Sequence, residues 1–104
     1  MDYRVSERNG QAQLFFSGEL DMAVGELAGK LLQQYGEKNQ TVTIDFRDVS
    51  FVDSSGIASL FFTTKELLAQ GKQVKIVNVR EEILDILQVL GFTQGLGISV
   101  EKAE

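Results

Sequence analysis

Three consecutive segments near the middle of the chain alternate between the apolar pattern of a strand and that of a helix. In "TVTIDF" (41–46) every second residue is apolar, and "KQVKIVNV" (72–79) is rich in β-branched residues, as strands are. Between them the spacing is helical over 56–70. A strand, a helix and a strand of these lengths form a right-handed βαβ unit with parallel strands. The chain is therefore expected to adopt an α/β fold. The helical positions are Ile57, Leu60, Phe61, Thr64 and Leu68.

The N-terminal part predicts two strands and a helix. Residues 2–8 form a weaker strand pattern, residues 11–18 a stronger one, and the dipeptide Asn-Gly between them is a strong hairpin turn. Apolar residues then recur at intervals of three and four, which indicates a helix that Gly36 can stop. The helical positions are Val24, Leu27, Ala28, Leu31, Leu32 and Tyr35.

The C-terminal part predicts a third helix and a last strand. Ile83, Ile86, Leu87 and Leu90 share a helical face; Gly91 suits a left-handed cap, with Phe92 as its hydrophobic contact. "GISV" (97–100) is a weak strand, and residues 99–104 are expected to fray as a polar tail. The predicted order is β-β-α-β-α-β-α-β, a mixed central sheet with helices packed against it, in one domain spanning 1–104.

Composition narrows the function. A net charge of −5 disfavours nucleic acid and anionic membranes as partners. The chain contains no Cys and no His, which excludes a thiol nucleophile, a disulfide framework and a Ser-His-Asp triad, and removes the commonest metal ligand. The first residues do not resemble a signal peptide, and no apolar run approaches the ~18 residues of a membrane span. A cytoplasmic protein that is not an ordinary hydrolase is expected.

The stretch "FVDSSGI" places a carboxylate and two hydroxyls at the mouth of the middle helix. This loop follows a parallel strand, where functional surfaces of α/β sheets tend to lie. Ser54 or Ser55 can cap the helix, which is the usual role of these residue types. Alternatively, one of them is phosphorylated: a helix N-terminus can hold a phosphate dianion, and Gly56 would let a kinase backbone approach closely. Beside Asp53, the added charge would repel a docked partner.

"SGELD" (17–21) is a second polar cluster, at the start of the first predicted helix. Asp21 is a good N-cap, and carboxylates are favourable in a first turn. The alternative is a carboxylate site for catalysis or a metal, built from Glu19, Asp21 and Asp53. The phenylalanines of "LFFSG" and "LFFTTKELL" are interpreted as core, and Asp45 and Asp48 as a strand end and a turn.

Read together, "GELD" (18–21), "IDFRDVSFVDSSGI" (44–57) and "LGF" (90–92) resemble the STAS domain, and specifically the single-domain anti-sigma factor antagonists of bacteria. The resemblance covers nearly the whole chain and implies the STAS-like mixed sheet. It implies that Ser54 is the phosphoacceptor, with Ser55 a less favoured candidate. The partner-binding residues that it implies are Glu19, Leu20, Asp21, Asp53, Ser55, Gly56 and Ser59.

The resemblance also implies a mechanism. The unphosphorylated antagonist binds an anti-sigma factor that is a serine kinase of the Bergerat-fold ATPase type, and so frees the sigma factor. Phosphorylation releases the antagonist, and a PP2C-type phosphatase restores it. The antagonist is not an enzyme and needs no cofactor or metal, since ATP and magnesium belong to the kinase. No nucleic acid, no membrane insertion and a monomer or weak dimer are expected. The alternative is a non-catalytic STAS subunit of an ABC-type lipid transporter or another signalling assembly.

Overall fold

A computed structural model describes residues 2–92, 95–96 and 98–103 as one α/β unit. Its elements follow the predicted order. The strands are β1 (Asp2–Arg8), β2 (Gln11–Leu20), β3 (Thr41–Val52), β4 (Gln73–Val79) and β5 (Ser99–Lys102), and the helices are α1 (Met22–Lys38), α2 (Ser54–Ala69) and α3 (Glu81–Val89).

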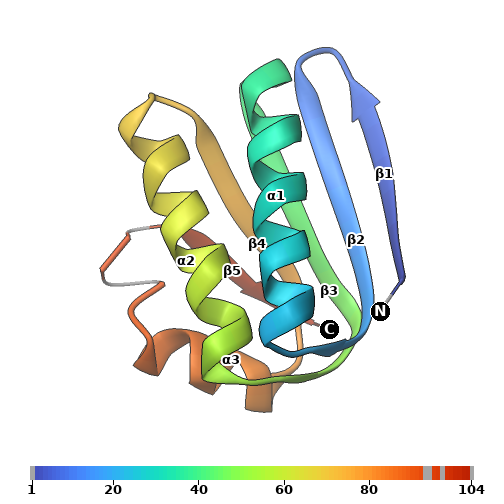
Figure 1. Ribbon diagram of the computed structural model, residues 1–104, viewed down its shortest axis with the longest axis vertical. Coiled ribbons are helices and arrows are strands. Elements are labelled where there is room, and N and C mark those ends of the chain that lie inside the picture. Colours follow the sequence, from blue (N-terminus) through green and yellow to red (C-terminus); the bar gives the residue numbers. More distant parts are fainter. Residues whose placement is uncertain (1, 93–94, 97, 104) are drawn as a thin grey trace.

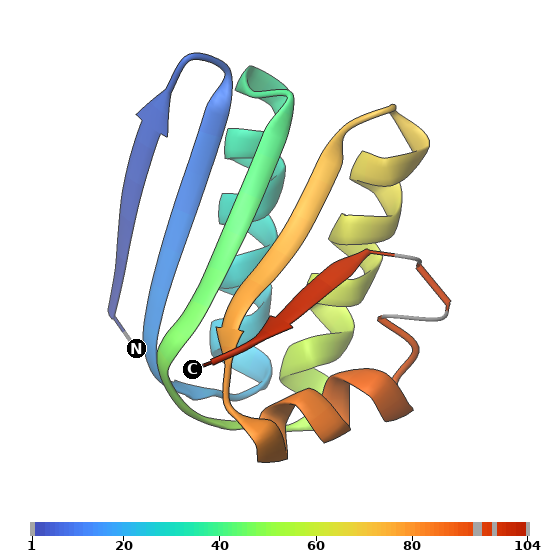
Figure 2. The same ribbon diagram turned by 180° about the vertical axis from the view of Figure 1, so that it is seen from behind.

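The five strands form one sheet in the order β1-β2-β3-β4-β5. β1 is antiparallel to β2, and every other neighbouring pair is parallel, so the sheet is mixed as predicted. Helices α1 and α2 cover one face of this sheet, while the strands lie in front when the molecule is viewed from behind (Figures 1 and 2). The core therefore lies between one sheet face and the helices. Its fully buried side chains include Leu14, Leu32, Ile44, Phe46, Leu60 and Ile76.

Helices α1 and α2 approach each other closely along a row of glycines. A Cβ on Gly25 would lie 2.1 Å from the Gly56 carbonyl oxygen, far inside van der Waals contact. A Cβ on Gly36 would lie 2.6 Å from Leu67 Cδ2. The prediction that Gly36 stops the first helix was wrong, because α1 continues through it to Lys38. Gly36 is buried inside the helix, where the absence of a side chain leaves room for Leu67.

β3 is longer than the predicted strand 41–46 and carries an irregularity near Asp45. The buried Asp45 carboxylate accepts hydrogen bonds from Arg47 N at 2.9 Å and from Asn78 Nδ2, on β4, at 2.8 Å. Beyond this point β3 no longer pairs with β4 but continues beside β2 to Val52. The interpretation of Asp45 as a strand end is therefore corrected: it marks where β3 and β4 diverge.

The chain after α3 partly matches the prediction. Gly91 has φ +92° and Phe92 is buried, which confirms the left-handed cap and its hydrophobic contact. The last strand is Ser99–Lys102, paired in parallel with β4, in place of 97–100. Residue 97 lies outside the described part of the chain, as does residue 104. The expectation that 99–104 frays is corrected, because four of these residues belong to the sheet.

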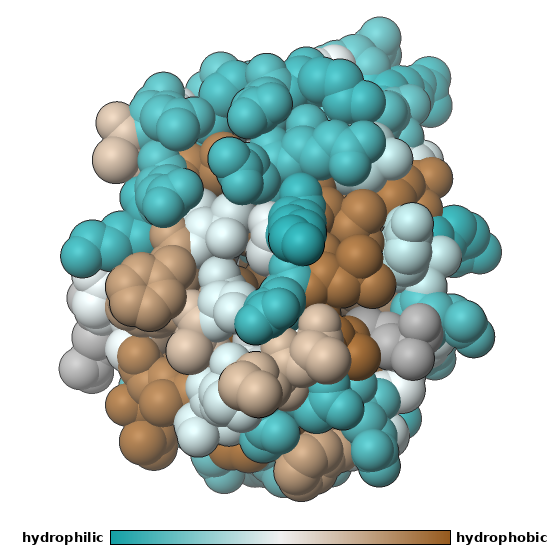
Figure 3. All heavy atoms as spheres, in the orientation of Figure 1, coloured by the Kyte–Doolittle hydropathy of each residue, from teal (hydrophilic) through white to brown (hydrophobic). Residues whose placement is uncertain are grey.

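The phenylalanines divide between core and surface. Phe16 is buried as predicted, and Phe61 packs edge-to-face on Phe92 with ring centroids 5.2 Å apart. Phe15 is only half-buried and packs under the Arg4 guanidinium, so its assignment to the core was wrong. Phe62, however, is 65% exposed on the outer face of α2, so its assignment to the core was wrong. In Figure 3 brown and tan apolar residues interrupt the teal surface on the helix-covered side. That side therefore exposes apolar area to solvent.

Candidate functional site

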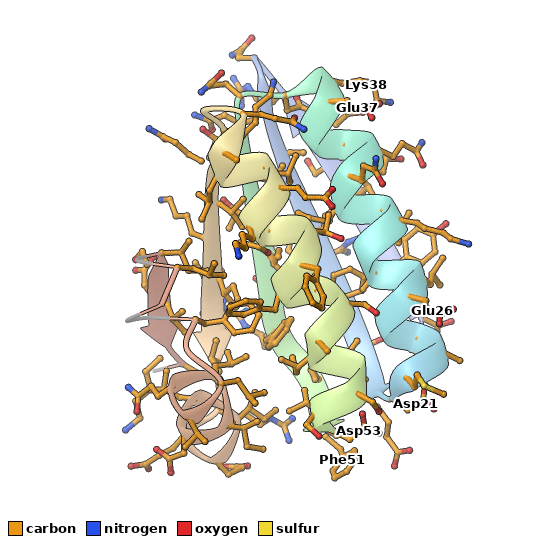
Figure 4. The ribbon with its side chains drawn as sticks, turned by 60° about the vertical axis from the view of Figure 1, so that its left-hand side comes forward. Asp21, Glu26, Glu37, Lys38, Phe51 and Asp53 are labelled. Atoms are coloured by element: carbon orange, nitrogen blue, oxygen red, sulfur yellow. The ribbon has the colours of Figure 1, made fainter. Side chains whose placement is uncertain are left out.

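Two helix N-termini lie side by side at one end of the molecule. α1 begins after β2 and α2 begins after β3, and Asp21 and Asp53 mark these two starts at the same end (Figure 4). The two turns are joined directly, since the backbone N–H of Asp53 donates to the Leu20 carbonyl oxygen at 3.1 Å. β2 and β3 are parallel neighbours, so their carboxyl ends meet here, and the stretch 53–56 lies at the carboxyl end of a parallel strand as predicted.

Asp53, not a serine, caps α2. Its Oδ1 accepts from the backbone N–H of Gly56 at 2.7 Å and from the Ser55 hydroxyl at 2.8 Å. Ser54 and Ser55 are the first two residues of the helix itself. The interpretation that one of the serines is the N-cap was therefore wrong. Asp53 sits one position earlier and reaches the N–H that a cap residue normally satisfies.

The same two hydrogen bonds set the charge state of Asp53. The Gly56 N–H, then the Ser55 hydroxyl, lower the pKa of Asp53 below its ordinary value of 3.8, because both donors stabilise the carboxylate; desolvation opposes them more weakly. Asp53 is therefore ionised throughout the physiological pH range. A fixed negative charge thus stands directly before Ser54.

The two hydroxyls differ in availability. Ser54 and Ser55 are both exposed, but the Ser55 hydroxyl donates to Asp53. Within the described residues, the Ser54 hydroxyl makes no hydrogen bond to another protein group. It stands in the first turn of α2, where backbone N–H groups and the positive end of the helix dipole gather. Ser54 therefore presents an accessible oxygen beside a site that tolerates an anion.

Beside Ser54 lies an open apolar depression of about 170 Å³. Its floor and walls come from α2 and from the end of α3, and Phe62 forms part of its rim. Sequence reasoning missed this feature, because it read Leu90 and the α2 apolar positions as core alone. Only the packing of α3 against α2 brings them together. The lining residues are Ser54, Ile57, Ala58, Phe61, Phe62 and Leu90.

The residues expected to bind a partner are only partly accessible. Glu19 and Asp21 are exposed, and Asp21 caps α1 by accepting from the Val24 N–H at 3.0 Å. Leu20 is fully buried, so the expectation that its side chain contacts a partner is wrong. The alternation of side chains along β2 explains why Leu20 is buried: successive residues of a strand point to opposite faces, and Leu20 points into the core while Glu19 points to solvent. Ser59 is half-buried and lines the groove between α1 and α2.

Gly56 is also buried, and its role differs from the predicted one. A Cβ at this position would lie 2.4 Å from the Leu20 carbonyl oxygen and 2.5 Å from that of Asp21. The backbone that approaches Gly56 is therefore this chain's own. The glycine is needed to join the two helix starts, and the expectation that it admits a kinase backbone is corrected.

The geometry does not support the alternative of a metal site built from carboxylates. In the part of the chain that the structure describes, no three Asp, Glu, His or Cys residues come together as a metal-binding group. Glu19, Asp21 and Asp53 share one end of the fold, but two of these carboxylates are occupied as helix caps. Among the described helices, none combines the length and apolarity required to cross a membrane.

Two curated proteins show what the chain is similar to. It is 25% identical over 97 residues to the anti-sigma-B factor antagonist of Bacillus subtilis (strain 168), covering 93% of this chain and 89% of that protein. It is 38% identical over 58 residues to low affinity sulfate transporter 3 of Stylosanthes hamata. That match covers 56% of this chain and 9% of the transporter.

Solved structures agree on the fold. The anti-sigma factor antagonist SpoIIAA in its unphosphorylated form matches with a TM-score of 0.75 at 19% identity, covering 99% of this chain and 90% of that one. The phosphorylated form of the Bacillus protein SpoIIAA gives 0.74, with 99% and 93% covered. The family described as the STAS domain matches residues 2–103. The chain therefore belongs to the STAS domain family.

Proposed function

We propose that this STAS domain is an anti-sigma factor antagonist whose partner binding is controlled by phosphorylation of Ser54. The observation that carries the proposal is that the side chains at the α2 N-terminus have different roles. Asp53 caps the helix and holds the Ser55 hydroxyl, while the exposed Ser54 hydroxyl is left without a local structural task. The similarity to the Bacillus subtilis anti-sigma-B factor antagonist supports the same role.

The surroundings of Ser54 suit a switch by charge. A phosphoryl group adds about −1.5 to −2 charges. The first turn of α2 tolerates that charge because of the helix dipole. A partner that docks on Glu19, Asp21 and Asp53 would instead face a strongly increased negative potential. Phosphorylation can therefore release the partner while the domain keeps its fold.

The partner in this scheme is an anti-sigma factor that is also a serine kinase of the Bergerat-fold ATPase type. The Ser54 oxygen attacks the γ-phosphorus of ATP, its proton passes to a base on the kinase, and ADP leaves. A PP2C-type phosphatase hydrolyses the phosphoserine and restores the binding form. The chain itself contributes binding and an acceptor oxygen, not catalysis, and it works in the cytoplasm, where ATP and the sigma factor are.

The acceptor is tested by mass spectrometry after incubation with the cognate kinase and Mg-ATP. The wild-type chain and Ser55→Ala should each gain one phosphoryl group on the peptide containing 53–57, and Ser54→Ala none. Ser55→Ala is the matched control, since it removes the neighbouring hydroxyl and leaves Ser54 in place. Phosphate on Ser55 alone, or none on the wild-type peptide, would contradict the proposal.

The switch is tested by binding. Ser54→Ala should bind the unmodified kinase as tightly as the wild-type chain and stay bound when ATP is added, whereas Ser54→Asp should bind at least tenfold more weakly. Calorimetry or fluorescence anisotropy measures both. If Ser54→Asp binds like Ser54→Ala, charge at this position does not control the complex.

A second candidate function is a non-catalytic STAS subunit of a transporter, of the ABC lipid type or another assembly. The exposed Phe62 and the match to part of a sulfate transporter favour it. In that case neither Ser54→Ala nor Ser54→Asp should change partner binding, and Phe62→Ser should weaken it strongly. The pair of Ser54 variants therefore separates the two candidates.

A further inference from the structure

The outer edge of β1 is the most regular unpaired strand edge in the described part of the chain. All seven residues of β1 pair with β2 without a bulge, whereas the β2–β3 and β4–β5 ladders are irregular. β1 is the end strand of the sheet, and six of its seven residues are exposed. Its other edge therefore offers backbone N–H and C=O groups to another strand. β5, the opposite end strand, has only four residues.

We propose that β1 pairs antiparallel with β1 of a second copy of this chain, about a two-fold axis at Val5. The result is a weak dimer with one continuous sheet across the axis. This inference is independent of the phosphorylation proposal.

The residue pattern of β1 supports one register. Tyr3, Val5 and Glu7 pair with β2 residues whose side chains face the helices, so these three side chains point to the helix-covered face. The remaining residues of β1 point to the other face of the sheet. A two-fold axis perpendicular to the sheet must pair residues of the same face with one another. Three central registers satisfy this condition, with the axis at Arg4, at Val5 or at Ser6.

Charge selects among these registers. The axis at Arg4 places Arg4 opposite Arg4, and the axis at Ser6 places Arg4 opposite Arg8 twice; like charges directly opposite are destabilising. The axis at Val5 places Asp2 opposite Arg8 twice. Opposite charges then meet at both ends of the paired segment, and two valines meet at its centre.

The neighbouring contacts agree with this register. The Arg4 guanidinium lies 4.5 Å from the centre of the Phe15 ring, on β2, and so points away from the outer edge. In the selected register Arg4 lies opposite Ser6, which carries no charge. Val5 is partly buried against the core, so its backbone is held in place for pairing.

The size of the contact sets its strength. One seven-residue strand pair buries less area than the roughly 1,200 Å² total of a standard stable interface. The dimer should therefore form only at high protein concentration and weaken with salt, since its charge pairs are exposed. β1 and α2 lie on opposite sides of the molecule in both ribbon views, so pairing through β1 leaves the N-terminus of α2, with Ser54, open (Figures 1 and 2).

Charged residues on an edge strand often prevent association between copies of a protein. The following experiment distinguishes such a protective role of Asp2 and Arg8 from the proposed pairing of two β1 strands. Asp2→Arg and Arg8→Asp each place like charges at both ends of the homodimer. Each variant alone should lose at least tenfold in association by sedimentation equilibrium. An equimolar mixture should form a heterodimer, because the two altered strands are then complementary. This rescue shows that both variants remain folded.

A thiol trap tests the register. The chain has no Cys, so Val5→Cys introduces a single thiol, and two copies at the axis come within disulfide range. Val5→Cys should form a disulfide-linked dimer under mild oxidation. The matched control Tyr3→Cys should not, since its two copies would be about 13 Å apart along the strand. A wild-type chain that stays monomeric at ~1 mM, a mixture without heterodimer, or equal trapping of both thiols would overturn the proposal.

Discussion

The starts of α1 and α2 are built alike but carry different side chains. Each helix follows a parallel strand, and in each an aspartate caps the helix by accepting from the N–H three residues later, at 3.0 Å for Asp21 and 2.7 Å for Asp53. Met22 and Ala23 follow the first cap, whereas Ser54 and Ser55 follow the second. Because α1 begins without hydroxyls, the architecture does not require them. Of the two α2 serines, Ser55 is engaged by its cap residue, and Ser54 is the one to which we assign the proposed function.

The most severe test of this comparison moves the hydroxyl from one helix to the other. The double variant Met22→Ser with Ser54→Ala places a serine at the first position of α1. It should take up no phosphate from the kinase, because the apolar depression lined by Ile57 and Leu90 lies beside position 54. Mass spectrometry measures the uptake. Phosphate on residue 22 would show that any serine at a helix start suffices.

The contact between the two helix starts is tested by filling it. Gly25→Ala should lower the free energy of unfolding by about 3 kcal/mol, because the new methyl group would meet the Gly56 backbone, which cannot move aside without separating the helices. Urea unfolding measures the change. The exposed neighbour Glu26→Ala is the control and should stay within about 0.5 kcal/mol of the wild type. Equal stability of the two variants would contradict the close packing.

The two caps are compared by removing each in turn. Asp21→Ala should lower the free energy of unfolding by about 1 kcal/mol, the usual cost of a lost N-cap, while Asp21→Asn should retain most of it. Asp53→Ala should shift the urea midpoint further, because it also leaves the Ser55 hydroxyl without its acceptor. Equal shifts for the two alanine variants would show that the Ser55 contact contributes nothing.

The smallest effect is a dependence on pH. The folded-state pKa of Asp53 is below its ordinary value of 3.8, so its contribution to stability is complete above that value and is lost as pH falls through the folded pKa. The wild-type chain should therefore lose stability relative to Asp53→Asn between about pH 5 and about pH 2. Urea midpoints across this range measure the difference, and parallel curves would count against the two hydrogen bonds.

Much of the fold followed from local patterns. The period of the apolar residues gave the order of the helices and strands, although β3 is longer than predicted and β5 is displaced. The left-handed Gly91 with the buried Phe92 was predicted because that motif depends on neighbouring residues alone. Asp21 was identified as a cap for the same reason. The errors in the predicted elements arose where tertiary packing overrode a local sequence signal. Gly36 resembles a helix stop, but the structure uses it as room for Leu67.

The candidate site was predicted in part. The motif located the exposed serines and its resemblance to the STAS domain favoured Ser54, yet the capping was assigned to the wrong residue, and the hydrogen bond that engages the Ser55 hydroxyl was not foreseen. Leu20 was expected on the surface and is buried, and Phe62 was expected in the core and is exposed. Each outcome depends on which face an element presents to its neighbours. A single sequence without the packed partners does not settle that choice.

The sequence by itself determined the order of elements, the α/β class and the position of the hydroxyl-bearing loop, since all three depend on spacing along the chain. The tertiary structure decided which carboxylate holds which donor, why Gly56 must be a glycine, and that the Ser54 oxygen is left unengaged beside an apolar depression. These features arise because α2 contacts the end of β2 and the start of α1 on one side and the end of α3 on the other, and these segments are distant from the start of α2 in sequence.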